Sequence, residues 1–85
     1  MNMDINSNKN IYKDKKLVLK TDNVKAYMTL ANIKSQRELS FLIGFSVNQV
    51  FLLFKRKAIP NGVFLANLCS LLHCKIDDIV EIVDK

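Results

Sequence analysis

The segment between residues 35 and 60 constrains the fold more than any other part of this 85-residue chain. Ser35 and Glu38 have the spacing of a capping box, in which the serine hydroxyl accepts from the Glu38 amide and the glutamate returns to the Ser35 amide. Gly44 comes where a tight turn needs a positive φ without a Cβ clash. Ser46 is a preferred residue for capping a second helix. The segment therefore predicts two short helices joined by a tight turn at Gly44.

Apolar residues at helical spacing predict three further helices, which makes the chain all-α with five short helices. The first begins at Asn23 with Asp22 as its N-cap. The fourth follows a Pro60–Asn61–Gly62 turn, and the fifth starts at Asp77 and Asp78, acids that suit a first helical turn. The side chains expected in the core are Val24, Tyr27, Met28, Ala31, Ile33, Leu39, Leu42, Phe45, Val50, Leu53, either Phe64 or Leu65, Leu68, Cys69, Leu72, Ile79, Ile82 and Val83.

Residues 1–22 are mostly Asn, Lys, Asp and Ser, which predicts a basic, flexible arm in front of a helical domain at 23–85. The apolar trio at 17–19 forms either a short extended piece or an added turn of the first helix. Residues 1–62 hold eleven Lys and Arg against four Asp and Glu, whereas residues 63–85 hold two against four. The asymmetry favours a polyanionic partner for the front half. The competing interpretation is that the arm and the charge serve solubility alone.

The sequence offers little to enzyme or metal chemistry. His73 is the single histidine, and with Cys69 and Cys74 it cannot supply the four ligands of a tetrahedral zinc site. The chain has no Ser-His-Asp or Cys-His arrangement and no glycine-rich phosphate loop. Its apolar runs stay well below the ~20 residues of a membrane span, and its N-terminus lacks the pattern of a signal peptide. We therefore expect a cytoplasmic protein that is not an enzyme, has no cofactor and does not enter a membrane.

The order and spacing of these features resemble the helix-turn-helix DNA-binding domains of the phage Cro and repressor type. The resemblance covers residues 24–84 and is carried by Ser35-Gln36-x-Glu38-Leu39, Gly44-x-Ser46, Val50, Pro60, Leu65-x-x-Leu68-Cys69-x-x-Leu72, Cys74, Asp78 and Ile79. It implies a compact five-helix, lambda-repressor-like fold with a flexible N-terminal arm. It also implies double-stranded DNA as the partner and transcriptional regulation, by repression, as the function. The third helix, which starts after Ser46, would read the operator.

By the same resemblance, Gln36 would meet a phosphate together with the amides of its helix N-terminus. Asn48 and Gln49 would face base edges, where an amide can pair bidentately with adenine, and Val47 and Leu52 would touch thymine methyls. The basic run at 55–57 would add affinity without sequence information. The predicted DNA-binding residues are Gln36, Arg37, Ser46, Val47, Asn48, Gln49, Phe51, Leu52, Lys55, Arg56 and Lys57.

Some residues depart from the family's pattern. Phe51 stands where a small polar residue is usual, and Leu52 where a polar or basic one is usual. Phe54 stands where a glutamate is usual, and Arg56 where the loop often has glycine. We expect Phe54 to replace a charged pair with an apolar contact to the first helix. Val47, Phe51 and Phe54 form an i, i+4, i+7 row, and an exposed apolar row marks a partner surface. The alternative function is therefore a protein-interaction module, antirepressor-like or inhibitor-like, that uses this face of the third helix. A further interpretation is that Phe51 packs against the arm.

Repressors of this kind gain affinity by dimerising on paired half-sites, so a homodimer is a second expected partner. The candidate seam is the fifth helix with the C-terminus, at Val80, Ile82 and Val83. The competing interpretation is that these residues only close the core of the monomer.

Overall fold

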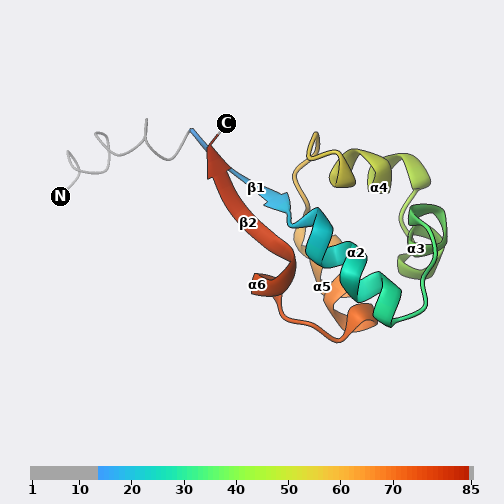
Figure 1. The fold of residues 1–85 in the computed structure, drawn as a ribbon. Coiled ribbons are helices and arrows are strands. Elements are labelled where there is room, and N and C mark those ends of the chain that lie inside the picture. The colour runs from blue at the N-terminus through green and yellow to red at the C-terminus, as the bar shows by residue number, and fades with distance from the viewer. Residues whose placement is uncertain (1–13, 85) are drawn as a thin grey trace, which may run out of the picture.

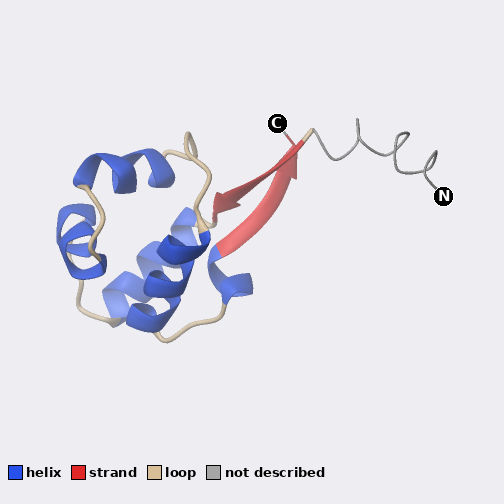
Figure 2. Cartoon of the chain, turned by 180° about the vertical axis from the view of Figure 1, so that it is seen from behind, coloured by secondary structure: helices blue, strands red, loops and turns tan. Residues whose placement is uncertain are grey.

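In the described part of the chain, five helices form a body, and a two-stranded sheet projects from one side of it (Figure 1). The computed structural model describes residues 14–84. The same arrangement seen from behind shows the strands outside the helical body (Figure 2). The elements are β1 (Lys15–Leu19), α2 (Thr21–Leu30), α3 (Gln36–Ile43), α4 (Val47–Phe54), α5 (Gly62–Leu72), α6 (Ile76–Ile79) and β2 (Val80–Asp84). The expectation of an all-α fold is therefore wrong, because the helical body carries a small sheet.

The sheet joins segments from the two ends of the described chain. β1 and β2 are antiparallel, and their register places Leu17 opposite Ile82 and Lys15 opposite Asp84. The last predicted helix ends at Ile79, because the residues after it pair with β1 as a strand. Ile82, which we expected in the core, is 71% exposed. The apolar trio at 17–19 takes the extended of its two predicted forms.

The first helix begins two residues earlier than expected. α2 starts at Thr21, its N-cap is Lys20, and Asp22 lies in the first turn instead of capping it. The Lys20 amide donates to the Ile79 carbonyl at 2.7 Å, so the strand leads directly into the helix. Residues 15–22 of the predicted arm thus lie in β1 and the first turn of α2. The prediction of flexibility for residues 1–13 falls outside the described residues.

The core collects side chains from every helix and from β1. Phe64, Leu39, Leu68 and Val50 are fully buried, and Leu19 brings the strand into the same cluster. Two predicted core residues are wrong besides Ile82, since Ala31 is exposed and Leu42 is 49% exposed. The predicted core residues that the structure buries are Val24, Met28, Ile33, Leu39, Val50, Leu53, both Phe64 and Leu65, Leu68, Leu72 and Ile79, while Tyr27, Phe45, Cys69 and Val83 are half-buried.

Polar caps explain where α5 starts and stops. The Asn61 side-chain oxygen accepts from the Phe64 amide at 2.8 Å, which satisfies one of the free donors at the helix start. His73 ends the helix in the left-handed conformation with φ 55. Between residues 14 and 84, no helix has the length and apolar character needed to cross a membrane.

Candidate nucleic-acid interface

The first helix of the candidate site is capped by Ser35. Its hydroxyl accepts from the Glu38 amide at 3.0 Å, as the spacing predicts. The reciprocal half differs, because the Glu38 carboxylate accepts from the Lys34 amide at 2.8 Å and not from Ser35. The cap still fixes where α3 begins and leaves Gln36 at its first position.

The turn between α3 and α4 is held from two sides. Gly44 adopts the left-handed conformation with φ 76, and the amide of Phe45 donates back to the Ser40 carbonyl at 3.0 Å. The Phe45 ring packs edge-on against Phe64 of α5, with ring centroids 5.3 Å apart. Asn67 of α5 donates to the Ile43 carbonyl at 3.2 Å. α5 therefore supports the turn that sets the direction of α4.

α4 begins with a complete capping box. The Ser46 hydroxyl accepts from the Gln49 amide at 3.1 Å, and the Gln49 side-chain oxygen accepts from the Ser46 amide at 3.0 Å. This contact occupies the oxygen that Gln49 would need to pair bidentately with a base. Gln49 is exposed but acts in the structure as part of the cap, and Asn48 is the exposed amide side chain beside it.

α4 has one face in the core and one in solvent. Val50, Leu53 and Phe54 are at most 8% exposed and attach the helix to the body. Asn48, Leu52 and Lys55 are exposed and follow one another at i, i+4 and i+7, so they form a single row along the opposite side. We call this the outward row.

The apolar row predicted on the same helix is not a solvent-facing surface. Phe54 is 8% exposed and belongs to the core cluster, whereas Val47 and Phe51 are half-buried. Phe54 lines a shallow pocket of ≈ 230 Å³ together with Met28 of α2. Phe54 and Met28 belong to the same core cluster, which fits the expected apolar replacement of a charged pair, and only Val47 and Phe51 of the row stay outside the core.

Two lysines that the sequence analysis did not single out lie near the start of α3. Lys25 of α2 and Lys34 before α3 line the same ≈ 230 Å³ pocket as Ser35 and Gln36. The first amides of a helix lack acceptors within the helix and attract anions, so cations gathered there strengthen the attraction. Lys25 could not be found from its spacing to Gln36, because it comes from another helix, whereas Lys34 is only two residues before Gln36.

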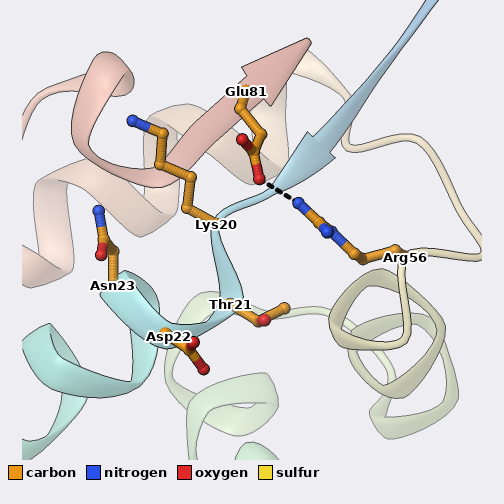
Figure 3. Close-up of a pocket in the computed structure, with 6 residues that line it drawn as sticks. All are labelled: Lys20, Thr21, Asp22, Asn23, Arg56 and Glu81. Carbon is orange, nitrogen blue, oxygen red and sulfur yellow. Dashed lines mark hydrogen bonds and ion pairs between the residues drawn. The ribbon is translucent and has the colours of Figure 1, made fainter. Parts of the chain in front are cut away.

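The three basic residues at 55–57 differ in their surroundings. Lys55 and Lys57 are exposed, whereas Arg56 is half-buried and pairs with Glu81 of β2. Arg56 also lines a polar pocket of ≈ 280 Å³ between the sheet and the start of α2 (Figure 3). Of the predicted residues, Arg37, Ser46, Asn48, Gln49, Leu52, Lys55 and Lys57 are exposed, and Gln36, Val47, Phe51 and Arg56 are half-buried.

The described residues contain no group of three His, Cys, Asp or Glu side chains placed to hold a metal ion. Comparison with protein families matches residues 23–85 to the Cro/C1-type HTH DNA-binding domain. Neither the curated proteins nor the solved structures that were searched contain a match.

Proposed function

The chain belongs to the family of Cro/C1-type helix-turn-helix DNA-binding domains, and from this premise we propose that it is a sequence-specific regulator that reads an operator with α4. The observation that carries the proposal is the outward row of α4, whose residues Asn48, Leu52 and Lys55 are exposed while the opposite face is buried. A helix anchored in this way can enter a major groove without disturbing the core. We infer that the regulation is repression, because a protein bound to the operator blocks other proteins from the same stretch of DNA.

Each member of the outward row has a different contact to make. Asn48, near the start of the helix, pairs with an adenine edge, which is worth about 1–3 kcal/mol of discrimination. Leu52 touches a thymine methyl. Lys55, with Lys57 beyond the helix end, lies over the phosphates and gives affinity without sequence information. At the start of α3, Gln36 binds a second phosphate with the help of Lys25 and Lys34.

The protein-interaction alternative depends on an exposed apolar row on α4. Phe54 is buried, and Val47 and Phe51 are half-buried, so these three side chains do not form the continuous exposed patch that marks a partner surface. DNA binding is supported instead by the polar and basic members of the outward row. The basic charge of residues 1–62 favours the same partner.

Selection of bound sequences from a random DNA pool, followed by salt titration of the best site, tests the proposal. We expect an enriched sequence and a steep fall of affinity with salt. Asn48→Ala should relax the preference at one base pair, while Lys57→Gln should weaken all sequences equally and reduce the salt slope by about 0.9. A pool without enrichment and a protein that retains no DNA at low salt would refute a DNA-binding regulator.

We also propose a homodimer that pairs β2 with β2 of a second copy. The Lys20 amide bonds the Ile79 carbonyl, and hydrogen-bonded pairs alternate along an antiparallel ladder. By this alternation the backbone groups of Ile82 point away from β1, toward the edge of β2 that pairs with no other strand among residues 14–84. Its side chain is 71% exposed, and an unpaired strand edge is a template for another strand.

Antiparallel pairing about Ile82 places Glu81 opposite Val83 and Asp84 opposite Val80 of the second copy, so no like charges meet directly. Sedimentation of Ile82→Asp should show a monomer where the unaltered protein shows a dimer. Ile59→Asp is the matched control, because Ile59 is 66% exposed and lies far from the sheet in sequence. A wild-type protein that stays monomeric at high concentration refutes the dimer and leaves binding to a single half-site.

A further inference from the structure

The loop that ends α4 contains a residue whose backbone is unusual. Lys57 N–H donates to the Leu52 carbonyl at 2.9 Å and Arg56 N–H to the Leu53 carbonyl at 3.1 Å, which is the Schellman arrangement of a helix end. Arg56 takes its left-handed position with φ 62. Glycine is usual there because a side chain strains this conformation, and the strain persists only where the surroundings hold the residue.

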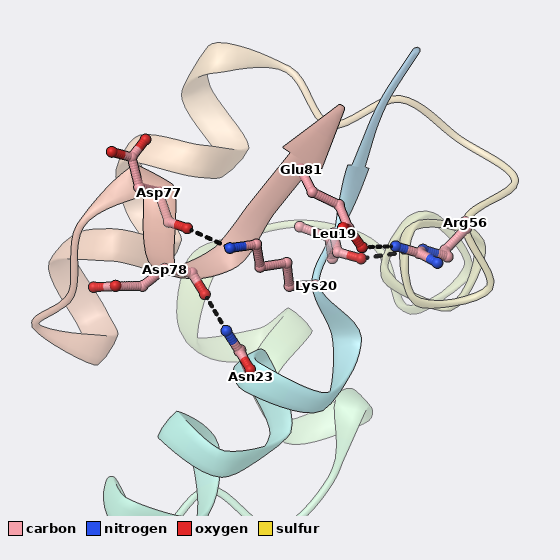
Figure 4. Close-up of polar contacts among 7 residues, drawn as sticks. All are labelled: Leu19, Lys20, Asn23, Arg56, Asp77, Asp78 and Glu81. Atoms are coloured by element: carbon pink, nitrogen blue, oxygen red, sulfur yellow. Dashed lines mark hydrogen bonds and ion pairs between the residues drawn. The ribbon is translucent and has the colours of Figure 1, made fainter. Parts of the chain in front are cut away.

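The Arg56 side chain supplies such a hold. Its Nε–H donates to the Leu19 carbonyl at 3.2 Å, and a terminal guanidinium nitrogen pairs with the Glu81 carboxylate. Leu19 ends β1 and Glu81 lies in β2, so one side chain joins the end of α4 to both strands (Figure 4). A planar guanidinium suits this role, because its fixed fork of donors can reach two acceptors at once.

We propose that Arg56 is a positioning residue that fixes the C-terminal end of α4 against the sheet and so sets how α4 enters DNA. The proposal rests on the proposed function, and it removes Arg56 from the set of phosphate contacts. The guanidinium charge is already balanced by Glu81, whereas its neighbours Lys55 and Lys57 are exposed. We call the contact of Arg56 with Leu19 and Glu81 the tether of α4. Since Glu81 is next to Ile82 in β2, the tether also connects α4 to the strand edge of the proposed dimer.

Salt titration of DNA binding separates positioning from phosphate contact. Arg56→Gly removes the side chain and suits the positive φ, so the fold is retained. A partly exposed ion pair changes an equilibrium by roughly two- to fivefold, and we expect a loss of specific affinity of that size with an unchanged salt slope. Lys57→Gln is the control and should reduce the slope by about 0.9. An equal reduction of the slope in Arg56→Gly overturns the proposal.

Glu81→Gln gives a readout whose direction distinguishes the two roles. If charge alone mattered, removing a carboxylate from this protein would tighten its binding to every DNA sequence. Positioning predicts that specific affinity falls while non-specific affinity does not, so their ratio falls about two- to fivefold. The double variant Arg56→Gly/Glu81→Gln should match Arg56→Gly alone, because the two residues act through one contact. Equal tightening on specific and non-specific DNA overturns the proposal.

Hydrogen exchange tests the tether without DNA. In Glu81→Gln the amides of Arg56 and Lys57, which close the end of α4, should exchange about two- to fivefold faster, while amides in the middle of α5 keep their rates. Unchanged rates at Arg56 and Lys57 overturn the tether. If the wild-type protein binds no DNA but Glu81→Gln still speeds exchange at Arg56 and Lys57, the proposed function is refuted and Arg56 is retained as the residue that holds the end of α4.

Discussion

Replacing Gly44 by alanine isolates the contribution of one backbone angle to stability. Gly44 has φ 76, and a Cβ placed on it meets no atom within 4 Å, so the substitution creates strain in the backbone but no clash. A residue with a side chain pays about 1–2 kcal/mol in the left-handed conformation. We therefore expect Gly44→Ala to lower the free energy of unfolding by about 1–2 kcal/mol, and to lower Tm by about 4–8 °C for each kcal/mol.

Gly62→Ala is the matched control. A Cβ on Gly62 also meets nothing within 4 Å, but Gly62 opens α5 and does not have a positive φ. Alanine there restricts the unfolded chain and should stabilise the protein by about 0.4–1 kcal/mol. Urea unfolding followed by circular dichroism measures both changes, and Gly44→Asn should lose less than Gly44→Ala because asparagine tolerates this conformation. The reasoning would be refuted if Gly44→Ala had the stability of the wild type, or if both alanine variants changed the free energy of unfolding in the same direction.

Three further outcomes follow from the contacts. Ser46→Ala should lower the free energy of unfolding by about 1 kcal/mol in urea and Ser46→Asp should restore most of it, whereas equal losses in both would contradict the cap. Phe54→Glu, at an 8% exposed site, should cost at least about 3 kcal/mol, while Phe41→Glu, at an 86% exposed site, should change stability by less than about 0.5 kcal/mol. Burial, followed by the neighbouring Cys69 thiol, raises the pKa of Cys74 to about 11. The unfolded chain then binds fewer protons than the fold between about pH 9 and 11, so stability falls there by at most about 1.4 kcal/mol per pH unit, and pH-dependent unfolding should show a shallower fall in Cys74→Ala.

The helix-turn-helix unit could be predicted because its determinants are local. Ser35, Gly44 and Ser46 each act within four residues of their own position, through a side-chain cap or a backbone angle. Such contacts depend on spacing alone, and spacing is visible in a sequence. The buried face of α4 was predictable for the same reason, since Val50 and Leu53 have helical spacing.

The sheet could not be predicted from the same rules. The last residues, from Val80 to Asp84, contain apolar side chains that suit a short helix as well as a strand, and five residues are too few to separate the two periods. The partner strand is more than 60 positions away, at Lys15–Leu19. Pairing of that kind is decided by the tertiary structure, which brings both ends of the described chain to one side of the body.

Two predicted DNA contacts, Gln49 and Arg56, are less suited to that role than the sequence suggests, for one physical reason. Each has a side chain that could bind DNA, but each already makes hydrogen bonds within the protein. Gln49 accepts from the Ser46 amide, and Arg56 donates to Glu81 and Leu19. An engaged donor or acceptor must break an existing hydrogen bond before it can bind a base or a phosphate, so the net gain from DNA is small. The proposal therefore assigns the DNA contacts to the exposed side chains of the outward row and predicts that Asn48 selects a base.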